Sequence, residues 1–156
     1  MTMSPGTLDG DAHPAGPALP PGGQRRRLPL AGLPKPVARA RAFTTEAVAD
    51  WYPPADARDG AGADVVLLVA ELVANAMLHG DGPLELVLDA TEQRLRVEVS
   101  DRSPAMPALR LPHEPALPGG HGLFIVQRTA DRWGAEPNGQ GKAIWAEFDA
   151  ERLTRG

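Results

Sequence analysis

The sequence predicts an α+β layer sandwich, and three observations lead to that fold class. Apolar residues recur with helical spacing in two segments before residue 80, and they alternate with polar residues in two shorter segments that follow. Those two expected strands have no helix between them, which favours a layered α+β domain over a doubly wound parallel sheet. A length of 156 residues favours a single domain with a core of its own.

The expected elements before residue 80 are bounded by proline, aspartate and glycine. Residues 28–30, Leu-Pro-Leu, fit a short edge strand, because an edge tolerates proline. Pro36 fits the first turn of a helix that runs to about residue 51. Asp64 fits the N-cap of a second helix, Val65 to His79, which Gly80 ends.

A strand pair, a loop, a helix and a last strand complete the expected order. Leucine and valine alternate with other residues in segments 84–88 and 95–99, which predicts a hairpin. Residues 102–118 contain five prolines and no periodicity, so we expect a long loop. A helix from Leu123 to about Trp133 and a strand from Lys142 to Asp149 follow.

Composition divides the chain into one domain and two tails. Residues 1–24 are rich in proline, glycine and alanine, so we expect a disordered tail there, either dispensable or able to bind a partner. The predicted domain covers residues 25–150, and residues 151–156 are expected to form a C-terminal tail.

Bulk composition excludes several classes of function. A net charge of −4 gives no support to nucleic-acid binding. The absence of cysteine excludes disulfides, thiolate metal sites and cysteine catalysis. We find neither a signal peptide nor an apolar run near the roughly 20 residues that span a bilayer. A cytoplasmic protein without membrane contact is the expectation.

The second expected helix carries a polar stripe beside its apolar one. Glu71, Asn75 and His79 are four residues apart and therefore lie along one side of the helix. The Asn oxygen is a hard ligand suited to Mg²⁺, and a nearby carboxylate can accept a proton from an attacking hydroxyl. A solvated polar face has the same spacing and, for this stripe alone, is the commoner explanation.

Asp101 lies at the end of a strictly alternating strand and shares the parity of Leu95, Val97 and Val99. The pattern points its carboxylate towards the apolar side, where burial is costly unless a donor meets it. An adenine amino group or a backbone N–H of the following turn would each serve, and this strand alone does not decide between them.

The third candidate is the glycine cluster Gly119-Gly120-His121-Gly122, directly before an expected helix. Glycine lets a backbone approach a phosphate closely, and helix N-termini attract anions. A flexible hinge is the commoner explanation for such a cluster alone. The common P-loop pattern is absent, because Ala143 follows Gly141-Lys142 where a Ser or Thr would stand.

Together and in order, these segments resemble the three sequence boxes of the GHKL ATPase superfamily. Residues 71–80 (ELVANAMLHG) resemble its N box, residues 97–104 (VEVSDRSP) its G1 box, and residues 120–126 (GHGLFIV) its G2 box. Residues 131–134 (DRWG) and 141–145 (GKAIW) are similar to the small bacterial anti-sigma-factor serine kinases, and stand-alone actinobacterial relatives match best. The resemblance covers Leu28 to Phe148.

The resemblance implies a Bergerat fold, in which a mixed, mostly antiparallel sheet carries helices on one face, and it implies residue roles. Glu71 would be the general base, Asn75 the Mg²⁺ ligand and Asp101 the acceptor for the adenine amino group. Residues 102–118 would form a lid over ATP. The other implied nucleotide-binding residues are Ser103, Gly120, His121, Gly122, Leu123 and Lys142.

The sequence departs from the family pattern at two places. Arg102-Ser103-Pro104 stands where glycines usually follow the aspartate of the G1 box. Ala143 replaces a threonine often found beside the adenine, which removes one water-bridged contact. We therefore expect modest affinity for ATP.

The leading functional interpretation is a serine/threonine kinase with ATP and Mg²⁺ as cofactors. Its implied partners are an anti-anti-sigma (STAS-like) protein, a sigma factor and a second copy in a homodimer. The alternative is an ATP-gated module that sequesters a partner without phosphoryl transfer. Two further alternatives are less well supported. A histidine kinase would need a dimerisation helix with a phosphoacceptor histidine. An α+β domain without a ligand would require that the polar stripe, the inward aspartate and the glycine cluster occur together by accident.

Overall fold

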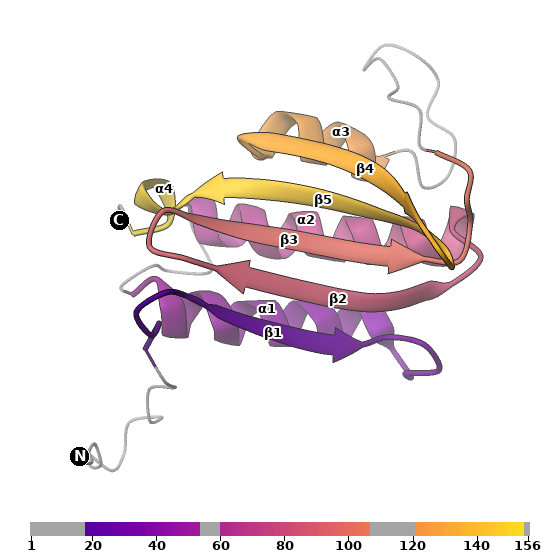
Figure 1. Ribbon diagram of the computed structural model, residues 1–156. Coiled ribbons are helices and arrows are strands. Elements are labelled where there is room, and N and C mark those ends of the chain that lie inside the picture. The colour runs from indigo at the N-terminus through magenta and orange to yellow at the C-terminus, as the bar shows by residue number, and fades with distance from the viewer. Residues whose placement is uncertain (1–17, 54–59, 107–120, 155–156) are drawn as a thin grey trace.

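The computed structural model describes residues 18–53, 60–106 and 121–154, with the backbone alone described for residues 121–124. One sheet has the strand order β1-β2-β3-β5-β4, and three helices lie on one of its faces (Figure 1). The strands are β1 (Gln24–Pro29), β2 (Pro83–Ala90), β3 (Arg94–Asp101), β4 (Arg132–Asn138) and β5 (Gly141–Asp149). The helices on that face are α1 (Pro36–Trp51), α2 (Gly60–His79) and α3 (His121–Thr129), and α4 (Ala150–Thr154) directly follows β5.

This architecture confirms the predicted α+β sandwich. The sheet is more regular than the mixed one expected, because all four of the ladders between its strands are antiparallel. Its strand order follows the chain except at β4, which forms the far edge and pairs with β5 alone.

The core lies between the sheet and helix α2. Alternate side chains of three strands point to the helices, and α2 buries its apolar stripe against them. Burying each large apolar side chain contributes about 1.5–3 kcal/mol. The hydrophobic core includes Leu86, Leu88, Leu95, Val97, Val99, Ile144, Ala146 and Phe148 of the sheet and Val65, Leu68, Val69, Leu72, Val73 and Ala76 of α2.

The central hairpin is as predicted. The predicted edge strand is present but longer and shifted, because β1 runs from Gln24 to Pro29 and not over residues 28–30. Strand β1 pairs only with β2, and Pro29 lies at its end. Trp51, at the end of α1, donates a hydrogen bond to Gln24, and its ring lies 4.7 Å below the Arg26 guanidinium. These contacts fix β1 to the helix layer. At the same end of the sandwich, the Tyr52 hydroxyl donates to the carbonyls of Thr91 and Arg94 beside the hairpin turn.

The third helix is shorter than predicted, and the strand after it was missed. Helix α3 ends at Thr129, whereas Trp133 belongs to β4. The turn forms because the Asp131 N–H donates to the Glu147 carbonyl, and the Asp131 carboxylate accepts from the Asp149 N–H. Pro137 and Gly134 give β4 little intrinsic preference for a strand, so pairing with β5 determines its structure.

The other corrected boundaries also reflect tertiary packing. Helix α2 begins at Gly60, four residues before the predicted N-cap Asp64, and Gly62 in the added turn is buried. Residues 151–154 are not a tail, since they belong to α4 and Leu153 is buried. Of the expected N-terminal tail, residues 1–17 lie outside the described residues, and Gln24 already begins β1.

Helix α2 is long and apolar enough, by length and composition, to cross a membrane. The sequence analysis predicts no such segment, whereas this helix, which contains Asp64 and Glu71, has the required length and composition. The test is weak evidence, since a central core helix of a sandwich passes it as well.

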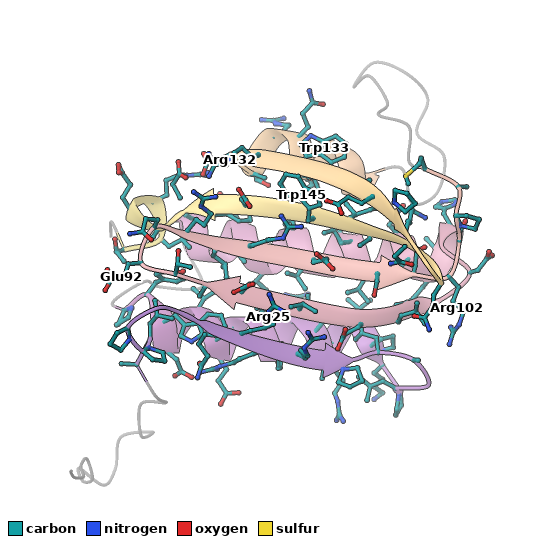
Figure 2. All side chains as sticks on the ribbon, in the orientation of Figure 1. Arg25, Glu92, Arg102, Arg132, Trp133 and Trp145 are labelled. Carbon is teal, nitrogen blue, oxygen red and sulfur yellow. The ribbon has the colours of Figure 1, made fainter. Side chains whose placement is uncertain are left out.

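The other face of the sheet carries charged side chains in place of helices (Figure 2). One row of cross-strand neighbours alternates in sign across all five strands, and its members form ion pairs. Opposite charges at neighbouring positions help to fix the register of the strands. The row consists of Arg25, Asp89, Arg96, Glu147 and Arg132.

Candidate functional site

The polar stripe of α2 contains two side chains that have no hydrogen-bond partner among the residues that the structure describes. Asn75 is only 9% exposed, and its carboxamide makes no hydrogen bond within the described part of the chain. Glu71 is half-buried one turn earlier, and its carboxylate has no hydrogen bond or ion pair to the described residues. His79, the third member of the stripe, is exposed at the end of the helix.

A buried carboxamide without partners requires an explanation. Native structures satisfy the large majority of buried polar groups, because leaving one unpaired costs about 1–3 kcal/mol. A ligand or a metal ion that contacts Asn75 would remove that cost. This position is therefore the strongest indication of a binding site on α2.

Asp101 points into the sandwich, as its strand parity predicts. It is 1% exposed, and its Oδ1 accepts a hydrogen bond from the backbone N–H of Ser103 at 3.0 Å. The second donor to Oδ1 is the ammonium of Lys142, at 3.1 Å. No described group donates to Oδ2 of Asp101.

Gly80 brings the end of α2 against this carboxylate. Its carbonyl accepts a hydrogen bond from the Arg102 N–H at 2.9 Å, which joins the end of the helix to the end of β3. A Cβ added at Gly80 would lie 2.5 Å from Oδ2 of Asp101, so a glycine is needed here for space. The helix that carries Asn75 therefore ends against Asp101 at one end of the sandwich.

Lys142 lies on the inner face of β5, directly across the ladder from Asp101. It is 4% exposed, and its ammonium donates to Asp101 and to the Ser103 carbonyl at 3.3 Å. The sequence reasoning placed Lys142 at the nucleotide without anticipating this pairing. The signal was present, because Lys142 has the same parity as the buried Ile144, Ala146 and Phe148.

The same end of the sandwich gathers three chain segments (Figure 1). The end of α2, the end of β3 and the start of α3 all lie there. Helix α3 packs against α2. A polar helix face, a buried carboxylate with an open oxygen and a helix N-terminus that attracts anions suit a ligand with a base and phosphates.

A family model, that of the histidine kinase-like ATPase domain, matches residues 30–148. The chain belongs to this family. It therefore carries an ATP-binding domain of the GHKL type, in agreement with its sandwich fold. A comparison with curated proteins finds no match.

Within this ATPase domain, the remaining predicted positions are only partly described. His121, Gly122 and Leu123 form the first turn of α3, but their side chains, like all of Gly119 and Gly120, lie outside the described residues. Of the expected lid, residues 102–106 are described and residues 107–118 are not. The described start of this segment is tightly hydrogen-bonded, because the Ala105 N–H donates to the Ser103 hydroxyl at 3.2 Å.

Proposed function

We propose that this ATPase domain is a cytoplasmic serine/threonine kinase of the anti-sigma-factor type, with a small STAS-like anti-anti-sigma protein as substrate. ATP is the phosphoryl donor, Mg²⁺ is the metal and Glu71 is the general base. The observation that carries the proposal is a pair of side chains on α2, Glu71 and Asn75, which have no partner among the described residues and lie on the helix that ends against Asp101. A protein that only binds ATP has no need for a carboxylate at the position of Glu71.

The donor set on α2 fits a magnesium ion held mainly by phosphates. Mg²⁺ typically takes one or two protein oxygens and completes its shell with phosphates and water. Asn75 offers one oxygen, and the described residues contain no group of three or more His, Asp or Glu side chains that could hold a metal alone. Magnesium bound there would neutralise charge on the phosphates.

Glu71 and Asp101 then have separate tasks. Glu71 accepts the proton that a partner serine or threonine hydroxyl loses as its oxygen bonds to the γ-phosphorus. The bond from that phosphorus to the β,γ-bridging oxygen breaks, and ADP leaves. Asp101 accepts a hydrogen bond from the adenine amino group through Oδ2, the oxygen that no described group occupies.

Titration with ATP, with and without Mg²⁺, tests the nucleotide site. Asn75→Ala should lose most of the Mg²⁺-dependent part of the affinity, and Asp101→Ala should lose affinity under both conditions. Asp81→Asn, at an exposed left-handed turn position that tolerates Asn, is a control for loss of a carboxylate. Unaltered binding in both site variants would overturn this assignment of residues.

Phosphoryl transfer tests the kinase assignment separately. Purified STAS-like proteins with a candidate serine, incubated with γ-labelled ATP, should be labelled by the wild type. Glu71→Ala should reduce transfer by about 100-fold or more while it still binds ATP. Glu46→Ala, which removes an exposed glutamate of α1, is the matched control. Normal transfer by Glu71→Ala would exclude Glu71 as the base.

The same mixtures test the partners and the alternative function. We also propose that the chain forms a homodimer and sequesters a sigma factor. Light scattering should then give twice the mass of one chain for the wild type alone and a larger mass after the sigma factor is added, and unchanged masses would overturn these two proposals. Partner binding that requires ATP but yields no labelled product would favour the ATP-gated binding module over the kinase.

A further inference from the structure

We propose that Lys142 is a positioning residue for the nucleotide base, which holds the Asp101 carboxylate in the one orientation that leaves Oδ2 open. The inference rests on the proposed function of Asp101 as the adenine acceptor. It assigns Lys142 a role through Asp101, in place of a contact with the nucleotide itself.

The ammonium of Lys142 already donates to two acceptors of the protein. Its side chain is almost fully buried on the inner face of β5, and its charge is 3.1 Å from Oδ1 of Asp101. Its second acceptor is the Ser103 carbonyl. A contact with phosphate would require breaking an ion pair between two groups that are both buried, which would leave Asp101 without its cation.

The two carboxylate oxygens of Asp101 differ in their hydrogen-bond donors. Oδ1 receives both the Lys142 ammonium and the Ser103 N–H, whereas Oδ2 lies against Gly80 and receives no hydrogen bond from the described residues. Two donors on one oxygen restrict rotation of the carboxylate. The remaining oxygen is an acceptor only, so it can pair with the amino group of a 6-aminopurine and not with the carbonyl of a 6-oxopurine.

Lys142 also stabilises the first turn of the segment after β3. Ser103 contributes its N–H to Asp101, its carbonyl to Lys142 and its hydroxyl to the Ala105 N–H. This turn contains Arg102, Ser103 and Pro104 where the GHKL pattern has glycines. The ion pair between Asp101 and Lys142 therefore fixes a segment whose sequence already restricts its motion.

The test compares ATP and GTP affinities of the wild type, Lys142→Met and Lys142→Arg. Lys142→Met keeps the length of the side chain and removes the charge and the donors. We expect its ATP affinity to fall by about tenfold or more, with GTP affinity little changed, so that the ratio between the two nucleotides falls by a similar factor. Lys142→Arg keeps the charge, so its ratio of ATP affinity to GTP affinity should lie between those of Lys142→Met and the wild type.

Arg96→Met is the matched control, because it removes a cation from the opposite face of the sheet, where Arg96 pairs with Glu147. It should leave the nucleotide ratio at the wild-type value. Thermal unfolding identifies the folded fraction of each variant. If Lys142→Met does not fold, Lys142→Gln, which keeps a donor without the charge, carries the same expectation.

The outcomes separate this inference from the proposed function. A wild type that binds ATP and a folded Lys142→Met with the wild-type ratio would overturn the positioning role and leave the nucleotide site intact. Equal loss of ATP and GTP would make Lys142 merely structural and would overturn it too. A wild type without ATP binding would overturn both.

Discussion

Two carboxylates on neighbouring strands, Asp101 and Glu147, are both buried, yet their surroundings differ. Asp101 lies on the helix-covered face at the end of β3, and Glu147 lies on the open face of β5 with 9% of its surface exposed. Each has at least one cation beside it. The difference lies in how many of the carboxylate oxygens the protein satisfies.

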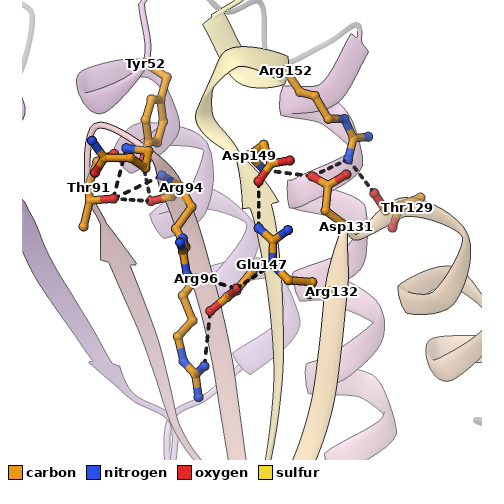
Figure 3. A network of polar contacts seen from close by, with 11 residues as sticks. Tyr52, Thr91, Arg94, Arg96, Thr129, Asp131, Arg132, Glu147, Asp149 and Arg152 are labelled. Atoms are coloured by element: carbon orange, nitrogen blue, oxygen red, sulfur yellow. Dashed lines mark hydrogen bonds and ion pairs between the residues drawn. The ribbon is translucent and has the colours of Figure 1, made fainter.

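Glu147 is surrounded by three arginines (Figure 3). Its Oε1 lies 2.9 Å from Arg132 and 3.6 Å from Arg94, and its Oε2 lies 3.4 Å from Arg96. Both oxygens are therefore occupied, and the cluster joins β3, β4 and β5. Asp101 has one cation, and its Oδ2 receives no hydrogen bond from the part of the chain that the structure describes. A saturated carboxylate indicates a structural role, whereas an open oxygen at a buried site indicates a place for a ligand.

The largest expected effect comes from removal of Asp101. Asp101→Ala leaves the Lys142 ammonium buried without its partner, which should lower the free energy of unfolding by about 3–5 kcal/mol. Denaturant unfolding measures this loss. The double variant Asp101→Leu/Lys142→Met removes both charges and should recover much of the stability without recovering ATP binding. A double variant as unstable as Asp101→Ala would contradict this account of the pair.

Glu147→Gln should lower the stability by less than Asp101→Ala does, and it should leave the affinity for ATP unchanged. The variant keeps the shape of the side chain but leaves three arginines without a full counter-charge, so we expect a loss of about 1–3 kcal/mol. Denaturant unfolding and ATP titration on the same sample separate the two properties. A large change in ATP affinity would show that the two faces of the sheet are coupled.

The sequence predicts Asp101 better than it predicts Glu147, for a physical reason. Alternation along one strand is local, so the inward direction of Asp101 follows from its parity with Val97 and Val99. The arginines around Glu147 come from positions 94, 96 and 132, and only the register of three strands brings them together. That register depends on β4, which local preference did not identify.

The same distinction between local pattern and strand pairing explains which residues near the site the sequence predicts and which contact it does not predict. The helix that carries Glu71 and Asn75, and the hairpin that carries Asp101, have strong periodic patterns. The pairing of Lys142 with Asp101 depends on the adjacency of β3 and β5, which are separated in the chain by α3 and β4. A parity argument gives the side of the sheet, but only the strand order gives the neighbour.

A pair of glycine substitutions sharpens the comparison between the two faces. Gly80→Ala would place a Cβ 2.5 Å from Asp101, and Gly134→Ala would place one 2.7 Å from the Trp145 ring on the open face. Each variant should lose about 1–3 kcal/mol of stability through overpacking. Only Gly80→Ala should also weaken ATP binding, since it displaces the carboxylate. Equal ATP affinities in the two variants would place Oδ2 outside the nucleotide site.

Removal of a third carboxylate, Asp131, should have the smallest effect on stability. Asp131 is paired like Glu147, but it is more accessible to solvent than either Glu147 or Asp101. Partial burial alone would raise the pKa of Asp131, but the Asp149 N–H and the Arg152 guanidinium, 3.0 Å away, lower it below its ordinary value. Arg152 also donates to the Thr129 carbonyl, so the contact joins the end of α3 to α4. Asp131 is therefore structural, like Glu147, but its carboxylate can titrate from solvent.

The lowered pKa fixes the sign of the pH effect. A carboxyl group that binds its proton less readily in the native state stabilises that state above its unfolded pKa, about 3.9 for Asp. This contribution is lost as the pH falls through the lower native value. Asp131→Asn should thus narrow the difference in melting temperature between about pH 6 and pH 2.5, by an amount that corresponds to about 1 kcal/mol or less. Asp81→Asn, at an exposed left-handed turn position that tolerates Asn, should keep the wild-type difference. If both variants show the wild-type difference, the acid sensitivity of the fold comes from carboxylates other than the one that joins α3 to α4.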